Sequence, residues 1–133
     1  MNKVIQPKGW APAKGYANGI LSKDGLLAVG GQIGWDEQQI FRSNDFILQM
    51  EQALKNILAV VTTAGGTAEN IIRLTWYVTD KRTYLACQRE VGEVYRRVLG
   101  RNFPAMTMVV VAGLIEDEAL LEIEATAIVP VGD

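Results

Sequence analysis

Residues 43–79 have the sequence SNDFILQMEQALKNILAVVTTAGGTAENIIRLTWYVT, and this stretch decides the fold. In its first half apolar side chains recur every three or four residues, which is the spacing of a helix with one wide buried face. Ser43, Asn44 and Asp45 are candidate N-caps, and Gly65-Gly66 supplies a C-terminal stop. The second half alternates with a period of two, which predicts a strand over residues 71–79.

The strand over residues 71–79 is expected to have one buried face and one open face. Alternation places Ile72, Leu74, Trp76 and Val78 on one face, and Arg73, Thr75, Tyr77 and Thr79 on the other.

A second helix is predicted after this strand. Asp80 or Thr83 can cap its start, and Gly100 ends it. The expected apolar stripe of this helix contains Cys87, Val91, Val94, Tyr95, Val98 and Leu99. The preferred interpretation of Cys87, the single cysteine, is a small buried hydrophobic residue of this stripe.

Further strands flank these elements on both sides. The segment 15–21 can begin a strand, Asp24-Gly25 marks a hairpin turn, and a strand over residues 26–29 follows, with a short strand near residues 40–41. Two strands are predicted over about residues 105–112 and 119–129, the last with Glu122, Glu124 and Thr126 on its polar face. The order predicts a two-layer α+β fold over residues 1–133, a single domain with two helices on one face of a mixed sheet.

The second face of the predicted sheet has no helices to cover it. It would carry Thr75 and Tyr77, together with either the set of residues that contains Met106 or the set that contains Val109. A partly apolar face left open in a monomer favours oligomerisation.

Composition excludes several classes of function. The chain has no histidine and one cysteine, so zinc sites, Ser-His-Asp triads and Cys-His dyads are not expected. Thirteen basic residues face fifteen acidic ones, and the net charge of −2 argues against nucleic acid as a partner. Residues 1–7 do not resemble a signal peptide, and no apolar run is long enough for a membrane span, so we expect no membrane partner and a cytoplasmic location.

Several polar or aromatic positions have both a structural and a functional interpretation. Gly30-Gly31-Gln32 is not a phosphate loop, and it marks either a tight strand end or backbone N–H groups that face a ligand. Glu122 and Glu124 form either a solvated strand face or a pair that divides acid and base work. Three arginines, Arg96, Arg97 and Arg101, are interpreted as a solvated helix end. Trp76 is expected to be a packing residue, whereas Trp35, just after the glycine turn, is a better candidate for lining a site.

Short motifs along nearly the whole chain occur in an order that is specific as a set. They are Gly15-Tyr16, Gly30-Gly31-Gln32-Ile33, Gln52-Ala53-Leu54-Lys55-Asn56, Val78-Thr79-Asp80, Tyr95, Phe103-Pro104-Ala105 and Leu121-Glu122-Ile123-Glu124-Ala125. This set resembles the Rid family (YjgF/L-PSP, enamine/imine deaminases). The resemblance implies a chorismate-mutase-like fold and a homotrimer with an inner barrel and three clefts between subunits. It also implies hydrolysis of reactive enamines and imines, without a metal or other cofactor.

The resemblance carries over to individual residues only in part. Tyr16 matches the site tyrosine of the family, Gly31 the glycine that approaches the ligand, and Glu122 the glutamate thought to position water. Active members have an arginine after the Phe-Pro-Ala motif that grips the substrate carboxylate, and this chain has Met106 there.

Two further polar positions of the family are changed. Gly92 stands where an asparagine is frequent, and Met108 where Ser, Thr or Cys is frequent. The chain therefore resembles the arginine-lacking branches of the family.

Two hypotheses for function remain close. The first is an enzyme that hydrolyses a small, relatively apolar imine or enamine, with Glu122 as the catalytic residue. Its substrate would contact Tyr16, Gly31, Trp35, Met106 and Met108 in a cleft between subunits. The second is a trimer that binds a small ligand or protects proteins without turnover, which the three lost polar groups favour. A ribonuclease is disfavoured by the charge and the absence of histidine.

Overall fold

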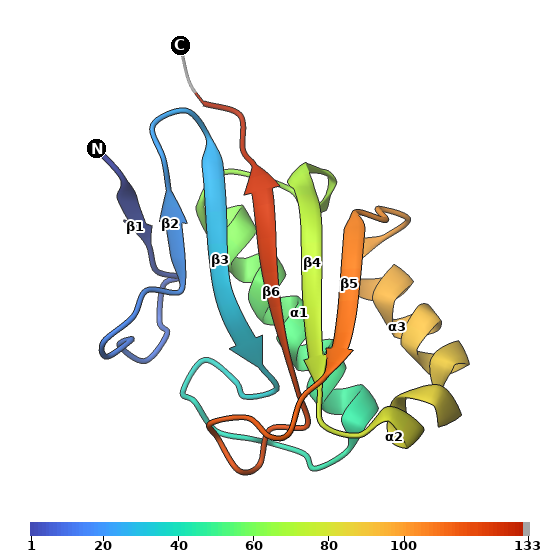
Figure 1. The fold of residues 1–133 in the computed structure, drawn as a ribbon. Helices are drawn as coiled ribbons and strands as arrows, with labels where there is room; N and C mark the ends of the chain where they lie inside the picture. The colour runs from blue at the N-terminus through green and yellow to red at the C-terminus, as the bar shows by residue number, and fades with distance from the viewer. Residues whose placement is uncertain (132–133) are drawn as a thin grey trace.

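In the computed structural model of the protein, which describes residues 1–131, one mixed sheet carries all helices on one face (Figure 1). The six strands have the order β1-β2-β3-β6-β4-β5, and β4 and β5 are parallel whereas the other neighbours are antiparallel. The elements are β1 (Lys3–Ile5), β2 (Gly19–Leu21), β3 (Leu26–Ile33), α1 (Phe46–Thr63), the 3-10 helix η1 (Ala68–Asn70), β4 (Ile71–Val78), α2 (Lys81–Ala86), α3 (Gln88–Leu99), β5 (Ala105–Val110) and β6 (Leu121–Ile128).

The core lies between the sheet and the helices, as the two-layer α+β prediction requires. Asp45 caps α1 through a hydrogen bond that its carboxylate accepts from the backbone N–H of Leu48, and Gly65 follows the helix with a φ of +96°. The buried face of α1 packs on β3 and β6. On β6, Leu121, Ile123, Ala125 and Ala127 are buried, which confirms the predicted alternation.

The strands and helices differ from the sequence prediction in five places. Strand β1 was not predicted, because three residues are too few for a periodic signal. Strand β3 continues through Gly30 and Gly31 to Ile33, with a register shift between Val29 and Gln32 that fits a bulge. The expected strand near residues 40–41 is a single bridge between Trp35 and Phe41.

The fourth difference is that the second helix is broken in two at Cys87. The backbone there leaves helical geometry, with a φ of −131°, between α2, which Asp80 caps, and α3. The thiol of Cys87 donates a hydrogen bond to the carbonyl of Thr83, and the residue is only half-buried rather than part of the core.

Strand β4 also departs from strict alternation at its first residues. A register shift between Ile71 and Arg73 places Ile71 in the core and leaves Ile72 49% exposed. The prediction that Ile72 shares the buried face of Leu74 was therefore wrong, because one bulged residue reverses the facing of every residue before it.

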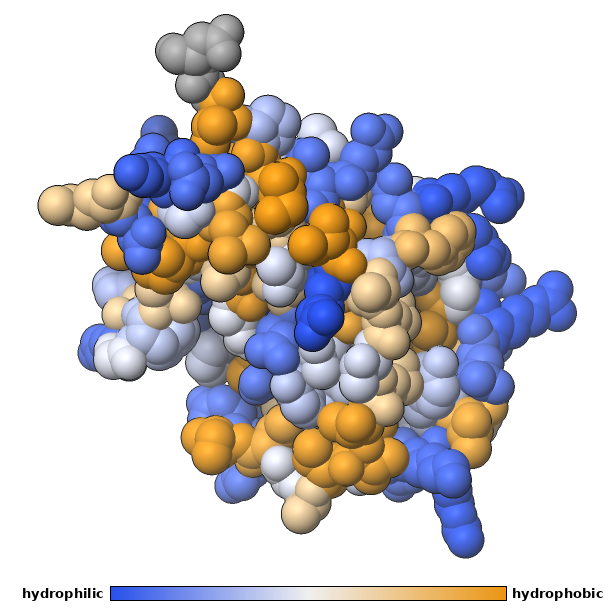
Figure 2. Space-filling model, turned by 45° about the horizontal axis from the view of Figure 1, so that its top comes forward, coloured by the Kyte–Doolittle hydropathy of each residue, from blue (hydrophilic) through white to orange (hydrophobic). Residues whose placement is uncertain are grey.

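The second face of the sheet is uncovered in the single chain. The register pairs Thr75 with Thr107 and Tyr77 with Val109, so the Val109 set lies on this open face, whereas Met106 and Met108 lie on the helix side. Figure 2 shows hydrophobic residues gathered at two places on the surface, with hydrophilic residues between them. The exposed large hydrophobic residues of the sheet include Leu26, Ile72, Val109, Val110 and Ile128.

Among residues 1–131, no helix is long and apolar enough to cross a membrane.

We predict that the open face is covered by two further copies of the chain. Sedimentation equilibrium should return three times the 14.6 kDa mass of the chain at micromolar concentration. Ile128→Lys should weaken association, because it places a charge on the open face, where Ile128 is 46% exposed. Leu48→Lys is the matched control, since Leu48 is 52% exposed but belongs to α1. A wild-type protein that sediments as a monomer contradicts the prediction.

Candidate functional site

Glu122 lies on the open face directly against the backbone of Gly31. A Cβ atom added to Gly31 would lie 2.7 Å from the carboxyl carbon Cδ of Glu122, far inside van der Waals contact. A side chain at position 31 would therefore displace the carboxyl group of Glu122 from its present place. Glycine at this position lets the carboxyl group of Glu122 lie over strand β3.

Glu122, Gly31, Tyr16 and Trp35 line one cavity of about 370 Å³. Tyr16 is half-exposed, and its hydroxyl accepts a hydrogen bond of 3.2 Å from the side chain of Gln39. The remaining residues of the wall are Asn18, Gln32, Ile33, Ile115 and Glu116. Four of the six residues predicted for the site are thus brought together within one chain.

Two buried side-chain amides, those of Asn18 and Gln32, form part of the wall of this cavity and are hydrogen-bonded to each other. The side-chain NH₂ of Gln32 donates to the side-chain oxygen of Asn18 at 3.1 Å and to the carbonyl of Gly30 at 3.2 Å. Asn18 in turn donates to the side-chain oxygen of Gln6 at 3.0 Å. Buried amides need such partners, so the network fixes the bulge of β3 against the segment before β2.

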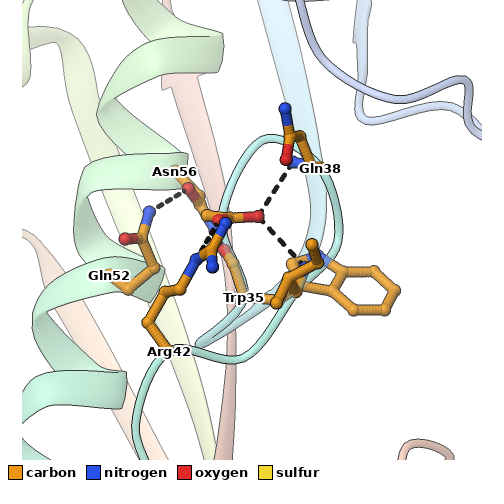
Figure 3. Close-up of polar contacts among 7 residues, drawn as sticks. Trp35, Gln38, Arg42, Gln52 and Asn56 are labelled. Carbon is orange, nitrogen blue, oxygen red and sulfur yellow. Dashed lines mark hydrogen bonds and ion pairs between the residues drawn. The ribbon is translucent and has the colours of Figure 1, made fainter.

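The loop after β3 is tied to helix α1, which positions Trp35 (Figure 3). The side chain of Asn56 donates to the carbonyls of Ile33 at 3.1 Å and Trp35 at 2.8 Å, and Gln52 donates to Asn56. Arg42 binds Asp36 at 2.7 Å across the same loop. The indole of Trp35 points away from α1 in Figure 3, so its backbone is anchored while its ring is left free for the cavity.

The electrostatic surroundings of Glu122 favour its protonated form. Burial raises the pKa of Glu122, and the nearby carboxylate of Glu124 raises it further. Glu124 accepts a hydrogen bond of 2.6 Å from the hydroxyl of Tyr77, and this bond raises the pKa of Tyr77. The two glutamates of β6 therefore differ in their surroundings, because Glu124 accepts a hydrogen bond from Tyr77, whereas Glu122 lines the cavity.

Met106 and Met108 lie in a second cavity, of about 240 Å³, on the helix side of the sheet. Tyr95 stacks on Phe103 there, with ring centroids 5.6 Å apart, and burial raises the pKa of Tyr95 to about 12. The wall also contains Trp76, Tyr84, Gln88, Val91, Gly92 and Arg96. This cavity is lined mainly by aromatic and thioether side chains.

The predicted site residues therefore form two groups within one chain. Glu122 pairs with Tyr77 on β4, and Tyr77 pairs with Val109 on β5, so the methionine cavity lies two strands away and on the opposite face. A cleft that contains all six residues requires that the β5 side of one chain meets the β3–β6 side of another.

Arg96 and Trp76 are residues of the second cavity that sequence reasoning did not place there. A Cβ atom on Gly92 would lie 3.2 Å from Nη1 of Arg96, so glycine gives the arginine room to fold back along α3. Gly92 and Arg96 are four residues apart on α3, so they share a helix face. This spacing is the signal that could have placed Arg96 beside Gly92 from the sequence.

A larger cavity of about 740 Å³ lies between the starts of α1 and α2 and is not a good candidate site. The backbone N–H groups at both helix starts are already capped, by Asp45 and by Asp80. Within residues 1–131, no group of three or more His, Cys, Asp or Glu residues could hold a metal ion.

Comparison with known proteins gives the same family at the level of sequence and of fold. The sequence model of the family described as Endoribonuclease L-PSP matches residues 7–129. A RutC family protein of Haemophilus influenzae is 37% identical over 128 residues, which are 96% of this chain and 98% of that protein. The crystal structure of the Rid family protein YyfA from Yersinia pestis, described as of unknown function, is 32% identical with a TM-score of 0.83, and the match covers 97% of this chain and 100% of that one.

A third relative was solved with a small molecule. The crystal structure of TdcF from E. coli with bound serine is 28% identical with a TM-score of 0.80, over 96% of this chain and 99% of that one. The family match over nearly the whole length, together with the shared sheet and helices, confirms the resemblance found in the sequence motifs. The chain belongs to the Rid (YjgF/L-PSP) family.

Proposed function

We propose that the protein hydrolyses a small, uncharged imine or enamine in a cleft between two subunits of a homotrimer. The observation that carries the proposal is the position of the Glu122 carboxyl group, which is half-buried against Gly31 and lines a cavity. The other glutamate of the strand, Glu124, is instead held by a hydrogen bond from the hydroxyl of Tyr77. Burial and Glu124 raise the pKa of Glu122, which makes its carboxyl group easier to protonate, and acid–base catalysis requires a group that both takes and gives a proton.

Glu122 can serve both halves of the reaction. As a carboxylate it takes a proton from water while the water oxygen bonds to the imine carbon, and it passes this proton to the imine nitrogen, which gives a neutral carbinolamine. The carboxylate then takes the hydroxyl proton of the carbinolamine and delivers it to the amino nitrogen, so that the C–N bond breaks, ammonia leaves and the C=O group forms. One group that is poised to gain and lose one proton therefore suffices.

The second half of the proposed cleft is the methionine cavity of a neighbouring subunit. Met106, Met108 and the stacked Tyr95 and Phe103 would pack against the apolar part of the substrate. The edge strand β5 is paired on one side only, so this half of the cleft is free to meet another chain.

A trimer that binds a ligand without turnover is the second candidate. Met106, Met108 and Gly92 stand where active family members are frequently polar, and this loss favours binding over catalysis. A ribonuclease activity is disfavoured, because the net charge is −2 and no histidine is present to act on a phosphodiester. The following experiments separate these candidates.

Glu122→Gln should lower the rate of ammonia release by about 10²–10⁴-fold, because it keeps the size of the side chain and removes its basicity. The measurement is kcat on any substrate found by screening imines, enamines and small lactams for ammonia or carbonyl release. Glu124→Gln is the matched control on the same strand. It should keep kcat and move the pH profile to lower pH, since the charge of Glu124 raises the pKa of Glu122.

Two results would contradict this assignment. Full activity in Glu122→Gln with loss in Glu124→Gln would exchange the two roles. A screen that finds no substrate would favour the binding trimer.

The contribution of Glu122 to the stability of the protein should fall as pH rises. Its folded-state pKa is raised above the ordinary value of 4.5, so the folded protein holds a proton that the unfolded chain has already lost. The stabilising contribution is complete below the ordinary pKa and is lost as pH rises through the raised one. Glu122→Gln should therefore have a higher Tm than the wild type at pH 8, with a smaller difference at pH 4. Glu37→Gln, at an exposed position, should show no such trend.

Imines that carry a carboxylate should be poor substrates, because Met106 cannot bind the charge that an arginine would. A matched pair is the imine formed from phenylalanine by an amino-acid oxidase and the imine formed from phenethylamine by an amine oxidase. Ammonia release above the spontaneous rate should be larger for the uncharged imine. Faster release from the carboxylated imine, abolished by Arg96→Met, would instead identify Arg96 as the replacement for the family arginine.

A further inference from the structure

The indole N–H of Trp76 is buried without a hydrogen-bond partner. Trp76 is 1% exposed, and in the part of the chain from residue 1 to 131 its Nε1 is the one buried side-chain nitrogen or oxygen atom that lacks a partner. Buried N–H groups are nearly always paired, because an unpaired donor has lost its bond to water and gained none in return. A bound ligand or an ordered water can supply the partner that residues 1–131 do not provide.

Trp76 belongs to the wall of the methionine cavity. It lies on the helix side of β4, and the parallel register places Met108 directly beside it on β5. Methionine side chains change conformation at little cost, and Met106 is 45% exposed. The thioether side chains can therefore move to let a ligand reach the edge of the indole.

The other polar groups of the cavity define the ligand chemistry. The hydroxyl of Tyr95 is already committed, since it donates to the carbonyl of Asn102. No carboxylate lines the cavity, and its one cation, Arg96, lies on the exposed side of α3. A buried neutral donor among aromatic and thioether groups suits a neutral acceptor, because an anion placed there would lose its hydration.

We propose that the indole Nε1–H of Trp76 binds a neutral acceptor atom, such as a carbonyl oxygen, that a small, uncharged, single-ring or similarly compact molecule carries apart from its reacting imine group. The apolar body of the molecule packs against Met106, Met108 and Phe103. This assignment rests on the proposed function, for which it names the substrate class and the group that replaces the carboxylate grip of an arginine. Trp76 acts as a binding and specificity residue, whereas Glu122 performs the proton transfers.

Two isosteric probes test the proposal on the wild-type protein. Acetophenone has a carbonyl oxygen where α-methylstyrene has a methylene group, and the two share a carbon skeleton. Acetophenone should bind about tenfold more tightly, the effect of one hydrogen bond to a donor that is otherwise unsatisfied. In a ¹H–¹⁵N spectrum, acetophenone should move the indole N–H signal of Trp76 downfield, and α-methylstyrene should not. Equal affinities with an unmoved signal overturn the proposal.

Variants assign the signal and isolate the N–H group. Trp10→Phe and Trp35→Phe each remove one indole signal and leave that of Trp76. Trp76→Phe keeps an aromatic ring and removes the donor, so acetophenone should fall to the affinity of α-methylstyrene. Trp10→Phe is the matched control and should keep the preference. The wild-type comparison stands without Trp76→Phe, so a folding defect in that variant leaves the test intact.

A third probe distinguishes a charged ligand from a neutral one. Benzoate should bind more weakly than acetophenone, and tighter binding of benzoate that Arg96→Met abolishes would overturn the proposal. Failure here is separable from failure of the proposed hydrolysis. Glu122→Gln should lower turnover whether or not the cavity prefers acetophenone, so equal affinities for the two probes overturn this assignment and leave the proposed hydrolysis standing.

Discussion

The insertion of the last strand between two earlier ones is the constraint on which the rest of the structure depends. Strand β6 pairs antiparallel with β3 on one side and with β4 on the other. Its alternate residues Leu121 and Ile123 fill the core, so Glu122 and Glu124 must face away from the helices. The central position also brings Glu122 against the bulge of β3 and Glu124 against Tyr77 of β4. Two carboxylates that differ by two positions thereby acquire different surroundings.

Sequence periodicity predicted the elements that follow a regular repeat. The helix from Phe46 and the alternation of β6 were predicted correctly, because burial imposes a period that each residue in the element repeats. The break at Cys87 and the exposed Ile72 were missed, since a single irregular backbone residue leaves no periodic trace. The family resemblance predicted the fold class, because the motifs that carry the resemblance and the fold itself both depend on residues spread over the whole chain.

Part of the candidate site follows from the sequence. Tyr16, Gly31, Trp35 and Glu122 share a cavity, and the Gly-Gly pair was a signal for it, because a side chain at position 31 would meet the carboxyl group of Glu122. Met106 and Met108 lie on the other face, so the predicted grouping with Glu122 would need contacts between chains, which the spacing of residues in one sequence does not encode. Trp76 was expected to be a packing residue, and it is one. Its unpaired N–H depends on the positions of neighbouring atoms, which no pattern of residue types reveals.

The two ends of the sheet are protected very differently. Strand β1 is a three-residue edge that begins with an exposed lysine, and such short charged edges resist pairing with other chains. Strand β5 is a six-residue edge of sequence AMTMVV, with neither charge nor proline. A chain that stands alone therefore offers a template for strand addition and aggregation along β5. In the proposed trimer, solubility would therefore depend on assembly, and damage to the contacts of β5 would be seen first as precipitation rather than as a stable population of single chains.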